Sequence, residues 1–133
     1  MGELATAFVA LAVEAARVGD LDTLERALGA GVSVESKSSR GDSLLTLASS
    51  HGHRPLVSAL LARGANPNVR DSGGQTVLSS AAFKGYVDVA EALVEGGASV
   101  NGTGEDGRTP LMMAAAFNRT EMVRWLLARG ARY

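Results

Sequence analysis

A step of 33 residues recurs along the whole chain and constrains its fold more than any other feature. Positions on this step hold the same or similar residues in Gly31, Gly64, Gly97 and Gly130, in Gly19, Gly52 and Gly85, in Leu45, Leu78 and Leu111, and in Ser43, Thr76 and Thr109. Repeats of this length are typical of solenoids, in which each unit buries its apolar face against its neighbours. We expect four units, at about 5–37, 38–70, 71–103 and 104–133, which leave no room for a second domain.

Each unit is predicted to be a helix, a turn and a second helix. Thr109 is expected to be an N-cap, because its hydroxyl can accept a free backbone N–H, and Pro110 suits the first helical position. Ser43 and Thr76 occupy the same position in the preceding units. Glycine after the first helix favours a left-handed turn, and Asn118, which replaces it in the last unit, is the next most tolerant residue.

The second helix is predicted from apolar residues at helical spacing, as in "VDVAEALVEGG", where Gly97 is expected to end the helix. A polar, glycine-rich stretch such as "ASVNGTGEDGRT" then leads to the next unit. It is long enough for an extended turn or a hairpin.

These features resemble the ankyrin repeat. The fourth unit carries "DGRTPLMMAAA" and the third "GGASVN", which match the T-P-L, A-A and G-A-x-x-N marks of that family. The resemblance implies an all-α dominated solenoid of helix–turn–helix units linked by β-hairpin-like loops, with residues 1–133 forming one domain. The first unit resembles an N-terminal capping repeat, since Glu14 takes a position that is apolar in Leu47 and Met113.

The family resemblance implies a protein–protein interaction module: an intracellular adaptor, scaffold or inhibitor, or alternatively an immunity- or antitoxin-type inhibitor of a specific enzyme. Its partner would be another protein, and a monomer is the default. In this family the hairpin tips and first helices line a concave recognition surface. By position, the protein-binding residues here would be Arg40, Asp42, His51, Ser72, Gln75, Phe83, Lys84, Glu105, Asp106, Arg108 and Phe117.

Phe83 and Phe117 allow two interpretations. The family fills its core with Ala and Leu, so an aromatic residue at the end of a first helix is not needed there. Aromatic residues inside a polar rim are typical anchors of protein interfaces. Alternatively, each ring packs on the neighbouring helix.

The stretch "GTGEDG" has the G-x-G-x-x-G spacing of a dinucleotide-binding loop. Such a loop needs a buried strand before it and a helix whose N-terminus meets the pyrophosphate. Here a helix end and a polar stretch precede it, and "VRDSGG" makes the equivalent connection without the glycine pattern. We therefore interpret it as a hairpin and expect no cofactor.

His51 and His53 could ligate a metal, but the chain has no cysteine and no further ligand at suitable spacing. A structural role is favoured, and no Ser-His-Asp arrangement can be assembled either. We expect no catalytic residues, no metal site and no enzymatic activity.

The charge alternates from unit to unit. Residues 1–37 carry six acids and three bases (−3), 38–70 one and four (+3), 71–103 four and one (−3), and 104–133 three and five (+2). Complementarity between neighbouring units explains this pattern, and a surface that selects a protein partner is the alternative. A nucleic-acid partner would require like charge on adjacent units, so none is expected.

No membrane segment is expected, because the sequence has no run of 18 apolar residues. Its start carries Glu3 and Glu14 and has no basic residues before the apolar stretch, whereas a signal peptide begins with basic residues. This difference favours a cytoplasmic protein. The Ala-, Arg- and Gly-rich usage hints at a bacterial source. Trp125 occupies the position that Ala59 and Ala92 occupy in the two preceding units. The larger side chain suggests a lid over the open end of the stack.

Overall fold

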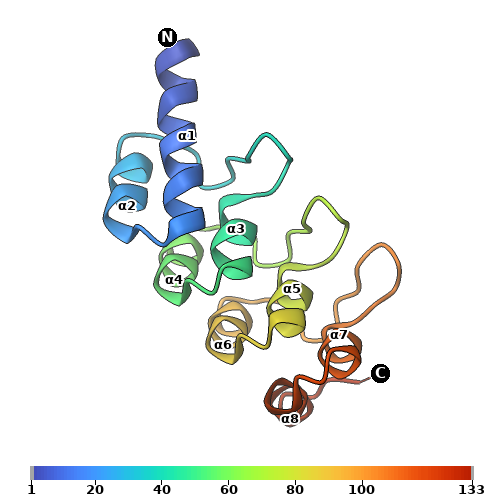
Figure 1. Cartoon of the computed structure of the whole chain (residues 1–133). Coiled ribbons are helices and arrows are strands. Elements are labelled where there is room, and N and C mark those ends of the chain that lie inside the picture. Colours follow the sequence, from blue (N-terminus) through green and yellow to red (C-terminus); the bar gives the residue numbers. More distant parts are fainter. Residues whose placement is uncertain (1, 133) are drawn as a thin grey trace.

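A computed structural model describes residues 2–132, which form eight helices arranged as four consecutive pairs (Figure 1). Within each pair the two helices pack on each other, and helices of the same kind pack on those of the next pair. The first helices are α1 (Gly2–Val18), α3 (Leu44–Ser50), α5 (Val77–Lys84) and α7 (Pro110–Ala116), and the second helices are α2 (Leu21–Gly29), α4 (Arg54–Ala62), α6 (Val87–Glu95) and α8 (Thr120–Ala128). The solenoid predicted from the repeat is confirmed.

The first helices of the last three units, α3, α5 and α7, begin and end as predicted. Ser43, Thr76 and Thr109 each accept a hydrogen bond from the backbone N–H three residues ahead. The turns after these helices need a left-handed residue, and the backbone φ there is +75° at Gly85 and +57° at Asn118. An L-residue with a bulky side chain would be strained at these positions.

The connections between units are turns with little strand character. Single antiparallel bridges join Lys37 to Ser43 and Arg70 to Thr76. Side chains tie each connection to the next one by accepting a backbone N–H of the following unit: Glu35 from Asn66 (3.0 Å), Asn68 from Ser99 (2.8 Å) and Asn101 from Arg132 (2.8 Å). The asparagine of the G-A-x-x-N pattern therefore links neighbouring units.

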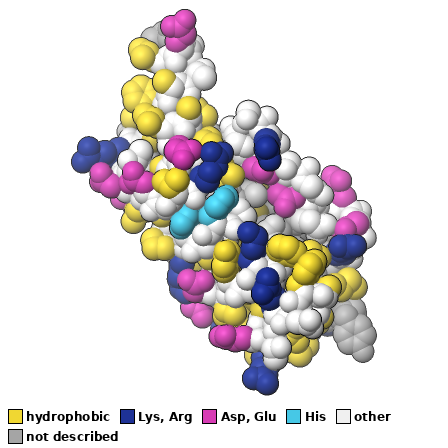
Figure 2. All heavy atoms as spheres, in the orientation of Figure 1, with side chains coloured by type: hydrophobic (Ala, Val, Ile, Leu, Met, Phe, Trp, Pro, Cys, Tyr) yellow, Lys and Arg dark blue, Asp and Glu magenta, His cyan; other side chains and the backbone are white. Residues whose placement is uncertain are grey.

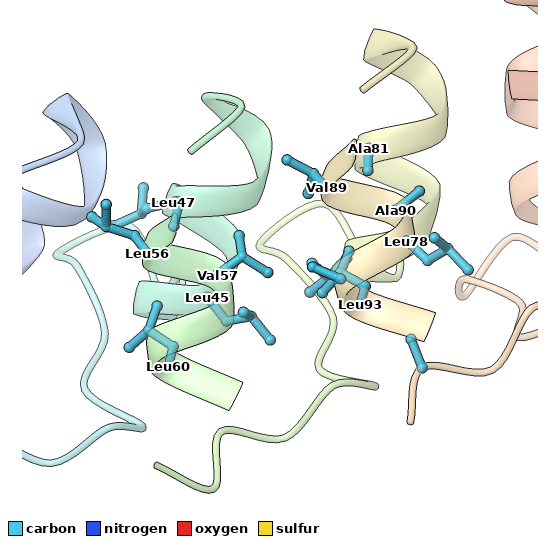
Figure 3. Packing of buried hydrophobic residues seen from close by; sticks show 14 of the residues in the cluster. Leu45, Leu47, Leu56, Val57, Leu60, Leu78, Ala81, Val89, Ala90 and Leu93 are labelled. Carbon is cyan, nitrogen blue, oxygen red and sulfur yellow. The ribbon is translucent and has the colours of Figure 1, made fainter. Parts of the chain in front are cut away.

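The core lies between and within the helix pairs. Figure 3 shows Leu45 and Val57 from one pair pointing towards Leu93 from the next, and all three are buried. Glu14 is exposed and pairs with Arg17 at 3.0 Å, whereas Leu47 and Met113 at the equivalent positions are buried. The polar residue therefore lies on the outer face of the first unit, as a terminal repeat requires.

Helix α1 is longer than the other first helices. It has 17 residues, against seven or eight in α3, α5 and α7, and protrudes from the stack (Figure 1). Residues 3–10 contain no glycine or proline and include three Ala, so nothing in the sequence ends the helix there. The repeat pattern did not predict this extension, because no other unit has an equivalent.

Trp125, on α8, packs against the hydrophobic core. Its ring is half-buried against the core, and the guanidinium of Arg129 lies 4.9 Å from the ring centroid. Met112 and Leu127 on α7 and α8 remain exposed. The tryptophan therefore leaves these two side chains uncovered, and its role as a lid stays a prediction.

Candidate functional site

A pocket of about 280 Å³ opens where the first helices meet the connections. We call it the central groove. Its walls come from the end of α3, the connection after Arg70, the length of α5 and one residue of α7, so it spans three units. The groove is lined by Ser50, Asp71, Gln75, Ser79, Ser80, Phe83, Lys84 and Met113.

Asp71 fixes the polar side of the central groove. Its Oδ1 accepts the backbone N–H groups of Gly73 and Gln75, both at 2.9 Å, and its Oδ2 accepts the hydroxyl of Ser80 at 3.1 Å. One carboxylate thus shapes the turn and joins it to α5. The groove wall is held in place by hydrogen bonds within the chain, which reduces the ordering that a ligand would have to impose.

Phe83 and Met113 form the apolar side of the groove, and Phe117 lies beside it in contact with Phe83. The centroids of the two phenylalanine rings lie 4.4 Å apart with an interplanar angle of 72°, an edge-to-face contact. Phe83 is half-buried against the core, whereas Phe117 is 46% exposed. Each of the two interpretations therefore fits one of the residues. Phe83 packs on its neighbours, whereas the ring of Phe117 rests on Phe83 and stays partly exposed to solvent.

Several predicted residues join adjacent connections to each other. The Oδ1 of Asp42 accepts the backbone N–H of Ser72 at 2.7 Å, and Gln75 Nε2 donates to Oδ2 of Asp106 at 2.9 Å. Hydrogen bonds from the backbone N–H of Arg108 and then from Gln75 lower the pKa of Asp106. Asp42, Gln75 and Asp106 therefore hold the row of turns together, whatever else they contact.

The remaining predicted residues divide by distance from the groove. Lys84 lines it, and His51 adjoins it through its neighbour Ser50. Exposed positions on the tips of the three connections are taken by Arg40, Ser72, Glu105 and Arg108. Gln75, Phe83, Lys84 and Phe117 are thus the predicted residues that the fold brings to one place.

The two histidines contact backbone carbonyl oxygens. Nδ1 of His51 lies 2.8 Å from the oxygen of Leu47, and Nε2 of His53 lies 2.9 Å from that of Arg17. A carbonyl oxygen only accepts, so each of these nitrogens carries a hydrogen. Figure 2 shows the pair side by side on the surface. Among residues 2–132 the structure contains no group of three or more His, Cys, Asp or Glu side chains placed to hold a metal ion.

The glycines of "GTGEDG" serve the contact between two turns. A Cβ atom at Gly104 would lie 2.8 Å from the carbonyl oxygen of Gly74 and from Oε1 of Gln75. Only a residue without a side chain fits against the preceding turn there. Gly107 has φ +80°, a left-handed conformation. Both positions have a structural reason for glycine that involves no phosphate.

The predicted site residues leave out five that line the groove: Ser50, Asp71, Ser79, Ser80 and Met113. The sequence did contain a signal for Ser80. It lies 33 residues after Leu47 and 33 residues before Met113, so it is polar at a position where two other units have an apolar residue. A polar residue at such a position in an inner unit indicates that it faces something other than the core. Asp71 and Met113 gave no comparable signal.

Comparison with known families supports the repeat architecture. A family model described as ankyrin repeats, in three copies, matches residues 12–103 and also residues 64–133. No curated protein matches the chain. The bacterial source suggested by the composition stays a prediction, because no relative with a known organism supports it. Within residues 2–132, every helix is too short or too polar to cross a membrane.

Proposed function

Because this chain belongs to the ankyrin repeat family, whose members are generally protein–protein interaction modules, we propose that it binds a partner protein through the central groove. The exposed ring of Phe117 carries the proposal. Phe117 is a large aromatic side chain that stays 46% exposed, and the other units have Val18, His51 and Lys84 at its position, so the core does not require an aromatic ring there. The ring does supply the apolar area that interface anchors use.

The chemistry of the central groove suits a partner side chain with both apolar and polar parts. Phe83 and Met113 offer an apolar wall, and Asp71, Ser80 and Lys84 surround it with polar groups. An apolar centre within a polar rim is the usual arrangement of a protein interface. Because Asp71 already bonds three groups of its own chain, the groove does not have to reorganise when a partner binds.

The partner's identity decides which kind of interaction protein this is. An adaptor or scaffold joins two proteins without changing their chemistry, whereas an immunity- or antitoxin-type inhibitor lowers the activity of the enzyme that it binds. We place this binding in the cytoplasm and attribute it to one copy of the chain per groove. An activity assay of the captured partner with and without the chain separates the two classes.

We predict that Phe117→Ala weakens partner binding at least tenfold while the protein stays folded. Loss of an interface anchor costs about 2 kcal/mol or more, whereas a half-exposed ring contributes less to folding. Affinity capture from the native cell extract supplies the partner, and isothermal titration of the purified pair measures the dissociation constant.

Val18→Ala is the matched control. Val18 occupies the position of Phe117 in the first unit, is also exposed, and lies three units away from it. We expect its affinity to equal that of the unchanged protein. A Phe117→Ala protein that is folded and binds as tightly as the Val18→Ala protein would refute the role of the groove.

A further inference from the structure

Both ends of the stack present apolar surface. Among residues 2–132, seven large hydrophobic side chains are exposed, and five of them lie at the ends: Leu4, Phe8 and Leu11 on α1, and Met112 and Leu127 on α7 and α8. Figure 2 shows hydrophobic side chains along the protruding first helix. We call the surface of Leu4, Phe8 and Leu11 the N-face and that of Met112, Val123 and Leu127 the C-face.

The C-face residues occupy the positions that, in the preceding units, pack against the next unit. Met112 is 41% exposed, whereas its equivalents Ser79, Thr46 and Val13 are 0%, 4% and 9% exposed because the next unit covers them. Leu127 is 53% exposed, whereas of its equivalents Leu28 is 8% exposed and Leu61 and Val94 are half-buried. Together with Leu111 and Ala115, the C-face residues line an almost wholly apolar groove of about 460 Å³. This surface continues the interface that already joins the units.

The N-face is the complementary surface. Leu11 is 52% exposed, whereas its equivalents Leu44 and Val77 are fully buried against the preceding unit. Phe8, on the extra turns of α1, borders a second pocket with Leu11, Thr23 and Arg26. Inside the stack, the surface of one unit that corresponds to the C-face packs against the surface of the next unit that contains Leu44 or Val77. The N-face of a second copy of the chain offers the corresponding surface, and it is not covered.

Charge favours this pairing over the meeting of two C-faces. Residues 1–37 carry six acids and three bases, a net −3, and residues 104–133 carry three acids and five bases, a net +2. A first unit placed after a fourth unit continues the alternation of sign along the stack. Two C-faces together would bring two positive units into contact, which like-charge repulsion opposes.

We propose that the chain self-associates end to end, with the N-face of one copy stacked on the C-face of another. The polar Thr23 and Arg26 beside the N-face make this contact weaker than an internal one, so the association is reversible. Because the two surfaces differ, the contact leaves one face free at each end and permits further growth. It replaces the monomer that the sequence favoured by default, and it does not involve the central groove.

Sedimentation velocity of the purified chain over a range of concentrations tests the proposal. The unchanged protein should show a weight-average mass that rises with concentration. A variant with Leu4→Glu and Phe8→Glu blocks the N-face, and one with Met112→Glu and Leu127→Glu blocks the C-face. Each alone should stay monomeric, with association weakened at least tenfold, because a carboxylate would be buried without a partner.

A mixture of the two blocked variants is the decisive arm. The N-face variant keeps an intact C-face, and the C-face variant keeps an intact N-face. One copy of each can therefore pair, and the mixture should form dimers and nothing larger. The control, Ser58→Glu with Ala62→Glu on the exposed side of α4, should associate like the unchanged protein. Phe117→Ala should also leave the association unchanged, which separates this proposal from the role of the groove.

Three results would overturn the proposal: a monomeric unchanged protein at every concentration, a dimer formed by the N-face variant alone, or a mixture that stays monomeric. If the C-face variant loses its circular dichroism signal, Met112→Ser with Leu127→Ala replaces it. Serine already occupies the position of Met112 in the third unit as Ser79, so this variant keeps a residue that the fold accepts.

Discussion

Ser49 shows how a single residue can depart from the pattern of its own chain. Its equivalents in the other units are Ala16, Ala82 and Ala115, and Ser49 itself is fully buried. None of residues 2–132 offers a hydrogen-bond partner to its Oγ. A buried hydroxyl without a partner has lost its hydrogen bonds to water and gained none in return.

We predict that Ser49→Ala stabilises the protein by about 1 kcal/mol, because the desolvation cost of the hydroxyl is removed and Ala is the better helix former. Urea denaturation followed by circular dichroism measures the free energy of unfolding. Ser50→Ala is the control, since the Ser50 hydroxyl already donates to the Leu47 carbonyl oxygen at 3.3 Å and should change stability little. A Ser49→Ala protein of equal or lower stability would show that the hydroxyl is satisfied in solution.

Among the elements, the connections between helix pairs depend on side chains more than on strands. Asn68 spans two of them, accepting the backbone N–H of Ser99 at 2.8 Å and donating to the carbonyl oxygen of Gly97 at 3.3 Å. Glu35, at the equivalent position of the first unit, accepts the backbone N–H of Asn66. A carboxylate is therefore tolerated where the acceptor is needed.

Asn68→Ala should lower the free energy of unfolding by about 1–2 kcal/mol, because it removes two hydrogen bonds between units. Asn68→Asp keeps the acceptor and loses only the donor, so we expect about half of that loss. Urea denaturation at neutral pH compares the two variants. Equal losses would mean that the bond to Ser99 contributes nothing and that the ladder of side chains does not join the units.

For the whole molecule, the repeat predicted the helices and their order because the signals that fix them are local. Ser43, Thr76 and Thr109 act as caps on backbone groups three residues away, and Asn118 adopts the left-handed turn within its own unit. Such features repeat with the sequence. The groove positions of Gln75, Phe83 and Lys84 also followed from the period, because each lies at a fixed place on a unit.

What the repeat could not predict depends on contacts between units, on residues that occur in one unit only, or on the lack of a neighbour. The 4.4 Å contact of Phe83 with Phe117 joins two units and occurs once. The hydrogen bond between Asp71 and Ser80 lies within one unit, but no other unit has polar residues that could form it at both positions. The length of α1 has no equivalent in the other units. Trp125 was predicted to cover the open end; its ring packs against the core, and that role stays a prediction.

Amide hydrogen exchange of the chain alone and with its captured partner tests the central claim, which is protein binding at the central groove. We predict slower exchange on binding in residues 71–75 and at the ends of α5 and α7, with the second helices α2, α4, α6 and α8 unchanged. Protection confined to those second helices, with no change in residues 71–75 and around Phe117, would contradict it.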